Sequence, residues 1–354
     1  MAAVRLDAVT KRFAHVAAID NVSLTVNEGE FLAVLGPSGC GKSTLLRLIA
    51  GFERPDDGSI HLGEKVVSSS DAYVAPEDRR IGMVFQSYAL WPHMTVAQNI
   101  AFPLRVQKFR AADLAREVAA ALKAVGLDGM GDRRPAELSG GQRQRVALAR
   151  CLAMKARVVL LDEPLANLDV HLRARMLSEI AAFRNLAGAT LIYVTHDQAE
   201  ALGVADRVAV MESGRVRQVA QPADLYRMPN DVAVSRFVGA GAVVHGEVTA
   251  TFANGHASVV VFGQQWRIRS APGQAVGTAQ ICIRPEDLRV VESGPGFPAT
   301  VVRSLYQGGR TVVDATPASD PDIMLNLSLQ SSDVRESGAT IHLSLIDGWV
   351  IPNH

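Results

Sequence analysis

Residues 36–44 read Gly36-Pro37-Ser38-Gly39-Cys40-Gly41-Lys42-Ser43-Thr44, and the rest of the chain is organised around this stretch. It matches the pattern G-x-x-x-x-G-K-[ST], a loop whose backbone N–H groups point inward and surround the phosphates of a nucleotide. Lys42 supplies a positive charge for the β- and γ-phosphates, and Ser43 offers a hydroxyl to Mg²⁺. The motif alone could also be a chance glycine-rich turn, so its surroundings must decide.

The flanking residues predict a strand before this loop and a helix after it. Residues 30–35 are an apolar, strand-like run, whereas residues 44–50 have helical spacing and end at Gly51, a candidate C-cap. A strand, a glycine loop and a helix N-terminus together form an anion site. The sequence therefore predicts a nucleotide site with ATP and Mg²⁺ as cofactors.

Polar residues follow three further strand-like runs. Asp162 and Glu163 end residues 157–163, His196 follows residues 189–195, and Gln86 ends residues 79–86. Ligands bind at the carboxyl ends of strands in open α/β sheets. We expect Asp162 to bind Mg²⁺, Glu163 to orient or deprotonate the attacking water, His196 to contact the γ-phosphate, and Gln86 to touch Mg²⁺ or the water. Taken singly, His196 is an ordinary surface histidine and Gln86 merely polar.

A second anion site is predicted about a hundred residues after the first. Ser139 is a candidate N-cap, and Gly140, Gly141 and Gln142 open a helix whose body is residues 143–154. The glycines expose N–H groups at the helix start. Residue types alone do not explain two phosphate sites in one chain, unless the second serves a nucleotide bound elsewhere.

The bulk composition excludes some classes of function. The chain has 354 residues, with 36 Lys and Arg against 36 Asp and Glu, which gives no reason to expect nucleic acid as a partner. No stretch is apolar enough to span a membrane, and the N-terminus lacks a signal pattern. The cysteines Cys40, Cys151 and Cys282 are scattered, which is typical of reduced cytosolic thiols. Oxidation of Cys40 would block the loop; a plain filler role is the alternative.

The pattern along the chain predicts two domains. Alternating strands and helices up to residue 238 predict a mostly parallel sheet with covered faces. A helical insert is expected at residues 87–137, with Pro92 and Pro103 bracketing a short helix and a second helix at 111–125. Short β-type runs in residues 239–354 predict a small barrel-like domain. The fold class is thus an α/β P-loop NTPase followed by an all-β domain.

The order of these pieces resembles the ATP-binding-cassette (ABC) ATPases. Leu138-Ser139-Gly140-Gly141-Gln142 is similar to their signature motif and residues 36–44 to their Walker A loop. The other matches are Gln86 for the Q-loop glutamine, Asp162 and Glu163 for the end of Walker B, residues 165–169 for the D-loop, His196 for the H-loop and Phe13 for the adenine-stacking aromatic. Without the resemblance, Phe13 would be read as core.

The resemblance implies a composite active site. In that family two cassettes enclose two ATP molecules head to tail, so Ser139 of one subunit would contact the nucleotide held by Lys42 of the other. Asp169 would border the same nucleotide. This arrangement accounts for the second anion site and implies a homodimer.

Two segments narrow the resemblance further. Residues 84–96 and 139–146 resemble importers for maltose, polyamines and ferric iron, which carry a C-terminal domain of the TOBE (oligonucleotide/oligosaccharide-binding-like) type. Arg284-Pro285-Glu286-Asp287 looks like a motif of that domain, and residues 237–241 look most like ferric-iron importers. The implied substrate is ferric iron, with a polyamine, a phosphonate or a sugar as alternatives.

The implied location is the cytoplasmic face of the inner membrane, as a peripheral subunit. The implied partners are two transmembrane permease subunits and, indirectly, a periplasmic substrate-binding protein. Within the insert, Tyr88, Leu90, Trp91 and Met94 are expected to form an edge that contacts the permease; a core role for some of them is the alternative.

Rival functions explain less of the sequence. A soluble ABC ATPase of DNA repair would carry a coiled-coil or zinc insert, one of translation would carry two cassettes, and an exporter would carry a fused membrane domain. An ordinary phosphotransferase with a P-loop does not explain residues 139–142.

Overall fold

The computed structural model describes residues 2–166, 168–330, 333 and 335–352. The chain divides into two compact units, residues 1–222 and 223–354. The boundary predicted from composition follows residue 238. The contacts place the division earlier, after Pro222, so that residues 223–238 belong with the β-rich unit.

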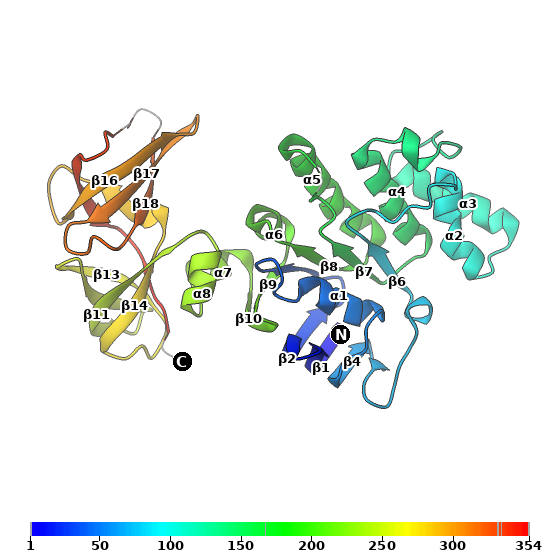
Figure 1. Cartoon of the computed structure of the whole chain (residues 1–354), viewed down its shortest axis with the longest axis horizontal. Helices are drawn as coiled ribbons and strands as arrows, with labels where there is room; N and C mark the ends of the chain where they lie inside the picture. The colour runs from blue at the N-terminus through cyan, green and yellow to red at the C-terminus, as the bar shows by residue number, and fades with distance from the viewer. Residues whose placement is uncertain (1, 167, 331–332, 334, 353–354) are drawn as a thin grey trace. The chain divides into compact units, whose positions relative to one another are not determined.

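A six-stranded sheet forms the centre of the first unit, in the order β10-β9-β3-β8-β7-β6 (Figure 1). Its strands are β3 (Phe31–Leu35), β6 (Ile81–Val84), β7 (Val158–Asp162), β8 (Thr190–Thr195), β9 (Arg207–Glu212) and β10 (Arg215–Ala220). All neighbouring strands run parallel except the β9–β10 hairpin. Every residue of β3 and β8 is buried, as expected for a sheet covered on both faces. Because these strands are parallel, the carboxyl ends of β3, β8, β7 and β6 all lie along the same edge of the sheet, the one formed by strand ends.

An antiparallel sheet of order β2-β1-β4-β5 packs beside it. Its strands are β1 (Ala2–Phe13), β2 (Val16–Asn27), β4 (Asp57–Leu62) and β5 (Lys65–Ser68). Alternate residues of β2, such as Val22, Leu24 and Val26, are buried in a core shared with α1 (Lys42–Ala50). The two sheets therefore enclose the helix that follows the phosphate loop.

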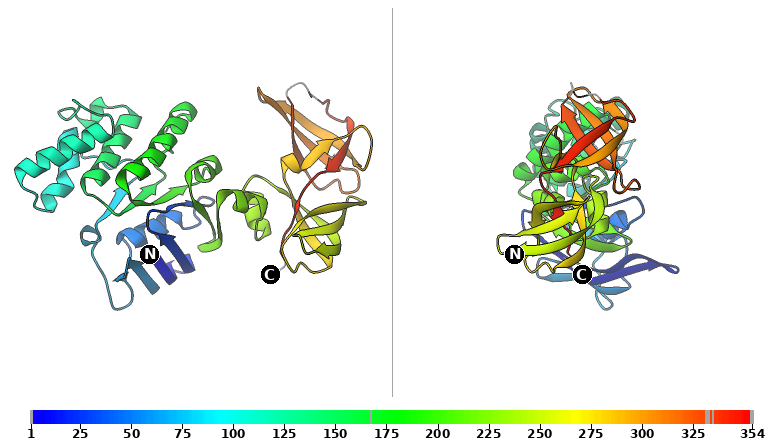
Figure 2. Two further views of the ribbon diagram at one scale, coloured as in Figure 1. Left: turned by 180° about the vertical axis from the view of Figure 1, so that it is seen from behind. Right: turned by 90° about the vertical axis from the view of Figure 1, so that its left-hand side faces the viewer.

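The remaining helices of this unit are α2 (Val96–Val106), α3 (Ala111–Ala124), α4 (Gly140–Ala153), α5 (Val170–Ala187) and α6 (Gln198–Val204), with short 3-10 turns η1 (Pro76–Asp78) and η2 (Pro135–Glu137). Figures 1 and 2 show α2, α3 and α4 grouped beside β6, the edge strand. They share a separate apolar core that includes Ile100, Leu104 and Val146. The predicted helical insert is confirmed, and α4 completes its core.

One detail of the predicted insert is wrong. Pro103 does not end the helix that begins at Thr95 but lies inside α2. Its neighbours Ile100, Ala101 and Leu104 are buried in the helical core, and this packing holds the helix together although proline donates no N–H. Tyr88, placed on the expected permease-facing edge, is only 6% exposed and takes the alternative core role.

The second unit begins with two short helices and a closed barrel. After α7 (Pro222–Arg227) and α8 (Val232–Phe237), the barrel has the order β11-β12-β13-β20-β14. Its strands are β11 (Ala242–Phe252), β12 (His256–Val261), β13 (Gln264–Ser270), β14 (Gly277–Ile283) and β20 (Trp349–Val350). The predicted small barrel is confirmed.

A five-stranded antiparallel sheet of order β15-β19-β16-β17-β18 completes this unit. It comprises β15 (Leu288–Val290), β16 (Phe297–Tyr306), β17 (Arg310–Pro317), β18 (Leu325–Gln330) and β19 (Thr340–Leu345), and the turn η3 (Pro285–Asp287) precedes it. Sheet and barrel share one apolar core. Composition did not separate these two layers.

The Arg284-Pro285-Glu286-Asp287 motif has a structural role within this unit. The buried Arg284 guanidinium donates to the carbonyl oxygens of Tyr226 (2.7 Å), Ser235 (3.0 Å) and Val238. The Asp287 carboxylate accepts the Arg284 backbone N–H at 2.8 Å, and burial raises the Asp287 pKa to about 6. Arg284 therefore ties α7 and α8 to the barrel through their C-terminal carbonyls.

Across the described residues, the search for a helix of sufficient length and apolarity to cross a bilayer finds none.

Candidate nucleotide site

The phosphate loop lies between β3 and α1 and leaves no room for side chains at two glycines. A Cβ on Gly36 would come within 2.3 Å of the Met211 carbonyl oxygen on the neighbouring strand β9. Gly41 has φ +106°, and a Cβ there would lie 2.3 Å from the Ala18 carbonyl oxygen. Gly39 has φ +81° in open space. Pro37, Ser38 and Gly39 are exposed, so the loop presents its backbone to solvent.

The start of α1 is left open for a ligand. No side chain caps it, because its N-cap residue is Gly41. The first N–H groups of a helix have no partner within the helix, so those at Lys42, Ser43 and Thr44 are available to an anion. The Lys42 ammonium, only 5% exposed, donates to the carbonyl oxygens of Gly36 at 2.7 Å and Pro37 at 2.9 Å. This cradle fits the phosphates of a nucleotide.

Ser43 and Asp162 meet although 119 residues separate them in the chain. The Ser43 hydroxyl donates to Asp162 Oδ1 at 2.9 Å. Burial raises the Asp162 pKa, against the hydrogen bond from Ser43, which lowers it. A hydroxyl and a carboxylate beside phosphate oxygens form the oxygen-only donor set that Mg²⁺ prefers, so these residues fit that ion.

Glu163 and His196 form the second pair at this edge. His196 Nδ1 lies 3.2 Å from Glu163 Oε2. Glu163 has φ 44°, the left-handed region that residues with a Cβ disfavour, and its N–H donates to the Val194 carbonyl oxygen at 3.0 Å. The turn after β7 thus points the Glu163 carboxylate towards the end of β8. A cavity of about 10 Å³, roughly the volume of one water, borders both side chains.

Gln86 lies at the same edge, but not at a strand end. The prediction placed it as the last residue of a strand from Arg79; the strand β6 covers only Ile81–Val84. Val84 pairs with Leu161, so Gln86 is level with the Asp162–Glu163 turn of the neighbouring strand. Its side chain is exposed.

The predicted second anion site is a helix start closed by its own capping box. Ser139 Oγ accepts the Gln142 N–H at 3.3 Å, and Gln142 Oε1 accepts the Ser139 N–H at 2.9 Å. Gly140 and Gly141 form the first turn of α4. Asp169 likewise caps α5, accepting the Leu172 N–H at 2.9 Å. Asn167 of the D-loop-like stretch lies outside the described residues.

In the described part of a single chain, no hydrogen bond links residues 139–142 or Asp169 to residues 36–44. Lys42 and Ser43 begin α1, after the loop that follows β3, and Asp162, Glu163 and His196 lie at the ends of β7 and β8; the three strands are neighbours in the sheet. The fold therefore gathers these five residues, whereas the signature-like stretch makes no described hydrogen bond to them.

Phe13 and Cys40 differ in exposure. Phe13, at the end of β1, is 46% exposed, and the Lys11 ammonium lies over its ring, 5.4 Å from the ring centre, so the exposed part of the ring is what a base could stack on. Cys40 is buried, and burial raises the pKa of its thiol. A thiol with a raised pKa is a poor nucleophile, which favours the filler role.

Sequence reasoning missed the buried cation that holds α1. The Arg79 guanidinium, 6% exposed, donates to the carbonyl oxygens of Leu48 and Ile49 at 2.8 Å each and of Val74 at 2.9 Å. It thereby satisfies carbonyls at the C-terminus of the phosphate helix. The only available signal was a pair of arginines before an apolar run.

A network behind His196 was also missed. Arg173 of α5 pairs with Asp197 (3.2 Å) and donates to the Leu168 carbonyl oxygen (3.2 Å). The buried Glu200 accepts hydrogen bonds from Tyr193 and Thr195 at 2.6 Å each. These contacts hold the turn after β8, which carries His196, against α5.

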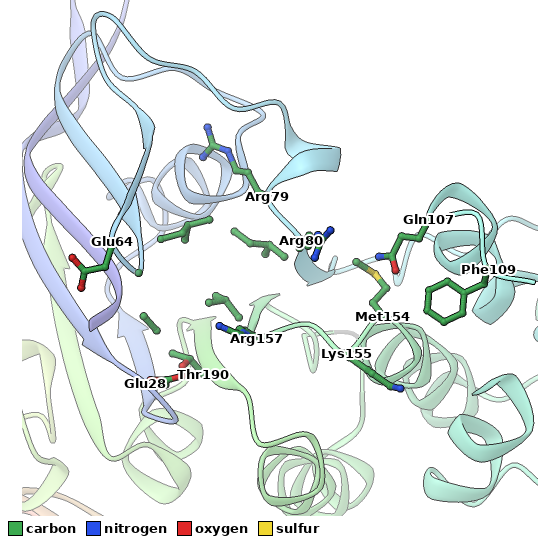
Figure 3. A pocket seen from close by; sticks show the side chains of 15 residues that line it. Glu28, Glu64, Arg79, Arg80, Gln107, Phe109, Met154, Lys155, Arg157 and Thr190 are labelled. Carbon is green, nitrogen blue, oxygen red and sulfur yellow. The ribbon is translucent and has the colours of Figure 1, made fainter. Parts of the chain in front are cut away.

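A cavity of about 970 Å³ lies at the opposite edge of the sheet, where β6, β7 and β8 begin at Ile81, Val158 and Thr190. Figure 3 shows Glu28 and Glu64 towards one side of it and Gln107 and Phe109 towards the other. It contains none of the predicted site residues, so cavity size does not locate the chemistry of this chain.

The sheet order, the uncapped phosphate loop and the strand-end carboxylates define a P-loop nucleoside triphosphatase. The chain belongs to the ABC transporter family, whose model matches residues 19–166, and a TOBE domain model matches residues 281–350. It is an ABC ATPase of the importer type with a C-terminal TOBE domain, as the relatives below also indicate.

Relatives match nearly the whole chain. The spermidine/putrescine import ATP-binding protein PotA of Nitratidesulfovibrio vulgaris is 41% identical over 362 residues, which is 98% of this chain and 96% of that protein. The Fe(3+) ions import ATP-binding protein FbpC of Brucella abortus is 42% identical over 351 residues, or 97% and 98% respectively.

Solved structures match the cassette. A dimeric ATP-binding cassette in a post-hydrolysis state, bound to ADP and Pi, has a TM-score of 0.54 and 31% identity, covering 62% of this chain and 98% of that one. CbiO1 from Clostridium perfringens, part of the ABC transporter complex CbiONQ, has a TM-score of 0.58 and 29% identity, covering 66% and 93%.

Proposed function

We propose that this chain powers substrate uptake as a homodimer bound to two transmembrane permease subunits, at the cytoplasmic face of the inner membrane. A periplasmic substrate-binding protein would deliver the cargo, for which we propose ferric iron. One observation supports the proposal most strongly. The side chains that would bind and hydrolyse ATP lie at one edge of the sheet, whereas the signature-like Ser139 makes no described hydrogen bond to them; these side chains are Lys42, Ser43, Asp162, Glu163 and His196.

Each side chain has a role that follows from its place. The uncapped N–H groups of α1 and the Lys42 ammonium bind the phosphates. Ser43 and Asp162 would hold Mg²⁺, whose charge offsets that of the transferring phosphoryl group. Glu163 accepts a proton from, or orients, the attacking water, and His196 holds the Glu163 carboxylate and reaches the γ-phosphate. Gln86 would contact the ion or the water from the neighbouring strand.

In a dimer, the second anion site of each chain would complete the nucleotide site of its partner. The Gly140 and Gly141 N–H groups at the start of α4, which the Ser139–Gln142 capping box does not use, would form an anion site that makes no described hydrogen bond to the loop of the same chain. A head-to-tail dimer would bring that surface to the phosphates held by Lys42 of the partner. The dimeric cassette among the similar structures supports this arrangement, as does the resemblance of Phe13 and Asp169 to nucleotide-bordering positions.

The cargo is tested by transport, because the chain has relatives named for Fe(3+) and for spermidine/putrescine at 42% and 41% identity. In cells of the source organism that lack this chain, its re-expression should restore uptake of radiolabelled ferric iron. The Glu163→Gln variant, expressed to the same level, is the matched control and should not restore it. Restored uptake of labelled spermidine with unchanged iron uptake would contradict the ferric-iron proposal and assign a polyamine.

A further inference from the structure

The segment that follows Gln86 has a strained backbone. Tyr88 has φ 63° and Ala89 has φ 45°, so two successive residues with a Cβ occupy the left-handed region. Such a conformation persists only where the surroundings impose it. Two helices, α4 and α2, make the contacts that do so here.

Arg150 of α4 holds the two strained residues directly. Its guanidinium donates to the Ala89 carbonyl oxygen at 2.9 Å and the Tyr88 carbonyl oxygen at 3.4 Å, and it lies 5.5 Å from the centre of the Trp91 ring. The residue is only 9% exposed, and burial lowers its pKa. No ion pair of the described residues includes it, so these carbonyls and the ring are the groups that stabilise a buried charge.

Asn99 of α2 holds the same segment from the other side. It is fully buried, accepts the Trp91 N–H at 2.8 Å, and donates to the carbonyl oxygens of Met94 (3.3 Å) and Thr95 (3.0 Å). Trp91 also stacks on Phe102 of α2, with ring centres 4.2 Å apart. Residues 88–95 are thus attached to α2 and α4, two of the three helices of the insert core.

We propose that Arg150 is a positioning residue that couples Gln86 to the Ser139 end of α4. The α-helix is stiff, and Ser139 lies roughly three turns before Arg150 on the same helix, so a shift of the segment at Arg150 displaces Ser139. Contact of Gln86 with the nucleotide is thereby linked to the placement of Ser139 against the partner's nucleotide. The inference rests on the proposed function.

Steady-state kinetics test the coupling. Arg150→Met removes the guanidinium and should lower kcat at least about tenfold while the KM for ATP changes less than about threefold, because the phosphate loop is untouched. Arg150→Lys keeps the charge without the planar fork and should be intermediate. The control is Arg145→Met on the same helix, whose guanidinium pairs with Glu179 of α5 (Nε to Oε2, 2.7 Å), and its kcat should stay within about twofold.

A double variant distinguishes coupling from a plain structural role. If Arg150 acts through the Gln86 segment, Arg150→Met in a Gln86→Ala chain should lower kcat by less than about twofold further. If the kcat losses of the two single variants multiply in the double variant, the proposal is overturned. It is also overturned if Arg150→Met has the same kcat as the Arg145→Met control. Wild-type turnover, measured first, tests the proposed function separately.

Trp91 provides a readout that does not depend on turnover. The chain has three tryptophans, so replacing Trp266 and Trp349 by Phe leaves Trp91 as the single reporter beside Arg150. Adding ATP should shift the fluorescence emission of Trp91 in this single-tryptophan chain, and the shift should be smaller when the chain also carries Arg150→Lys. The lysine variant can be measured even if Arg150→Met does not fold. An identical ATP-dependent shift in both would overturn the coupling.

Discussion

Replacing Glu163 by glutamine is expected to remove nearly all ATP turnover and to leave ATP binding intact. The carboxylate is held 3.2 Å from His196 at the end of β7, where it can take a proton from water, and an amide of the same shape cannot. The loss should be at least about a hundredfold in kcat, as for removal of a general base. Phosphate release and nucleotide titration measure the two quantities on one preparation.

The matched control is Glu179→Gln, the same change at a carboxylate that pairs with Arg145 away from the site. It should retain turnover within about twofold, because partly exposed ion pairs contribute little to stability. Near-normal hydrolysis by Glu163→Gln would falsify the role given to Glu163.

Replacing Lys42 by alanine is expected to weaken ATP binding and hydrolysis together. Lys42 is buried, and its ammonium donates to the loop carbonyls of Gly36 and Pro37, the loop that is proposed to bind the phosphates. Loss of a charge-assisted hydrogen bond corresponds to at least about a tenfold rise in the Kd for ATP. Equilibrium titration with a fluorescent ATP analogue measures it.

Lys155→Ala, which breaks a surface pair with Glu117, is the control and should bind ATP as the wild type does. A Lys42→Ala chain that binds ATP with wild-type affinity, and whose only defect is slow hydrolysis, would contradict the binding role.

The parts of the site that depend on local sequence were predictable. The loop from Gly36 to Thr44 needs particular residues at particular spacings, and its helix ends at Gly51 as expected. Buried parallel strands appear as apolar runs, so the predicted positions of Asp162 at the end of β7 and of His196 directly after β8 are correct. Parallel topology then brings strand ends together without further information.

The parts that depend on distant partners were not predictable. Arg79 and Arg150 have the appearance of solvent-facing residues, yet both are buried because carbonyl groups of other segments surround them. The local preference of Pro103 predicts a helix end, which burial of Leu104 overrides. The apolar run before Gln86 predicts a strand that ends there, because the run extends beyond the residues that pair with β7.

The capping contacts of Ser139 and Asp169 explain why a single chain does not reveal their role towards the nucleotide. In one chain each residue closes its own helix start, an ordinary structural function. Their proposed contact with nucleotide exists only between two chains. The proposed composite site therefore requires that two surfaces of different subunits lie close together.

An inter-chain crosslink tests that distance directly. Gly39 has φ +81°, so the exposed neighbour Ser38 carries one cysteine and Ser139 carries the other, on separate Glu163→Gln chains in which Cys40, Cys151 and Cys282 have been replaced. When the two chains are mixed with ATP and Mg²⁺ and then oxidised, a shared active site should give a covalent dimer that forms only with nucleotide. Absence of that dimer, from chains shown to bind ATP, would contradict the shared active site.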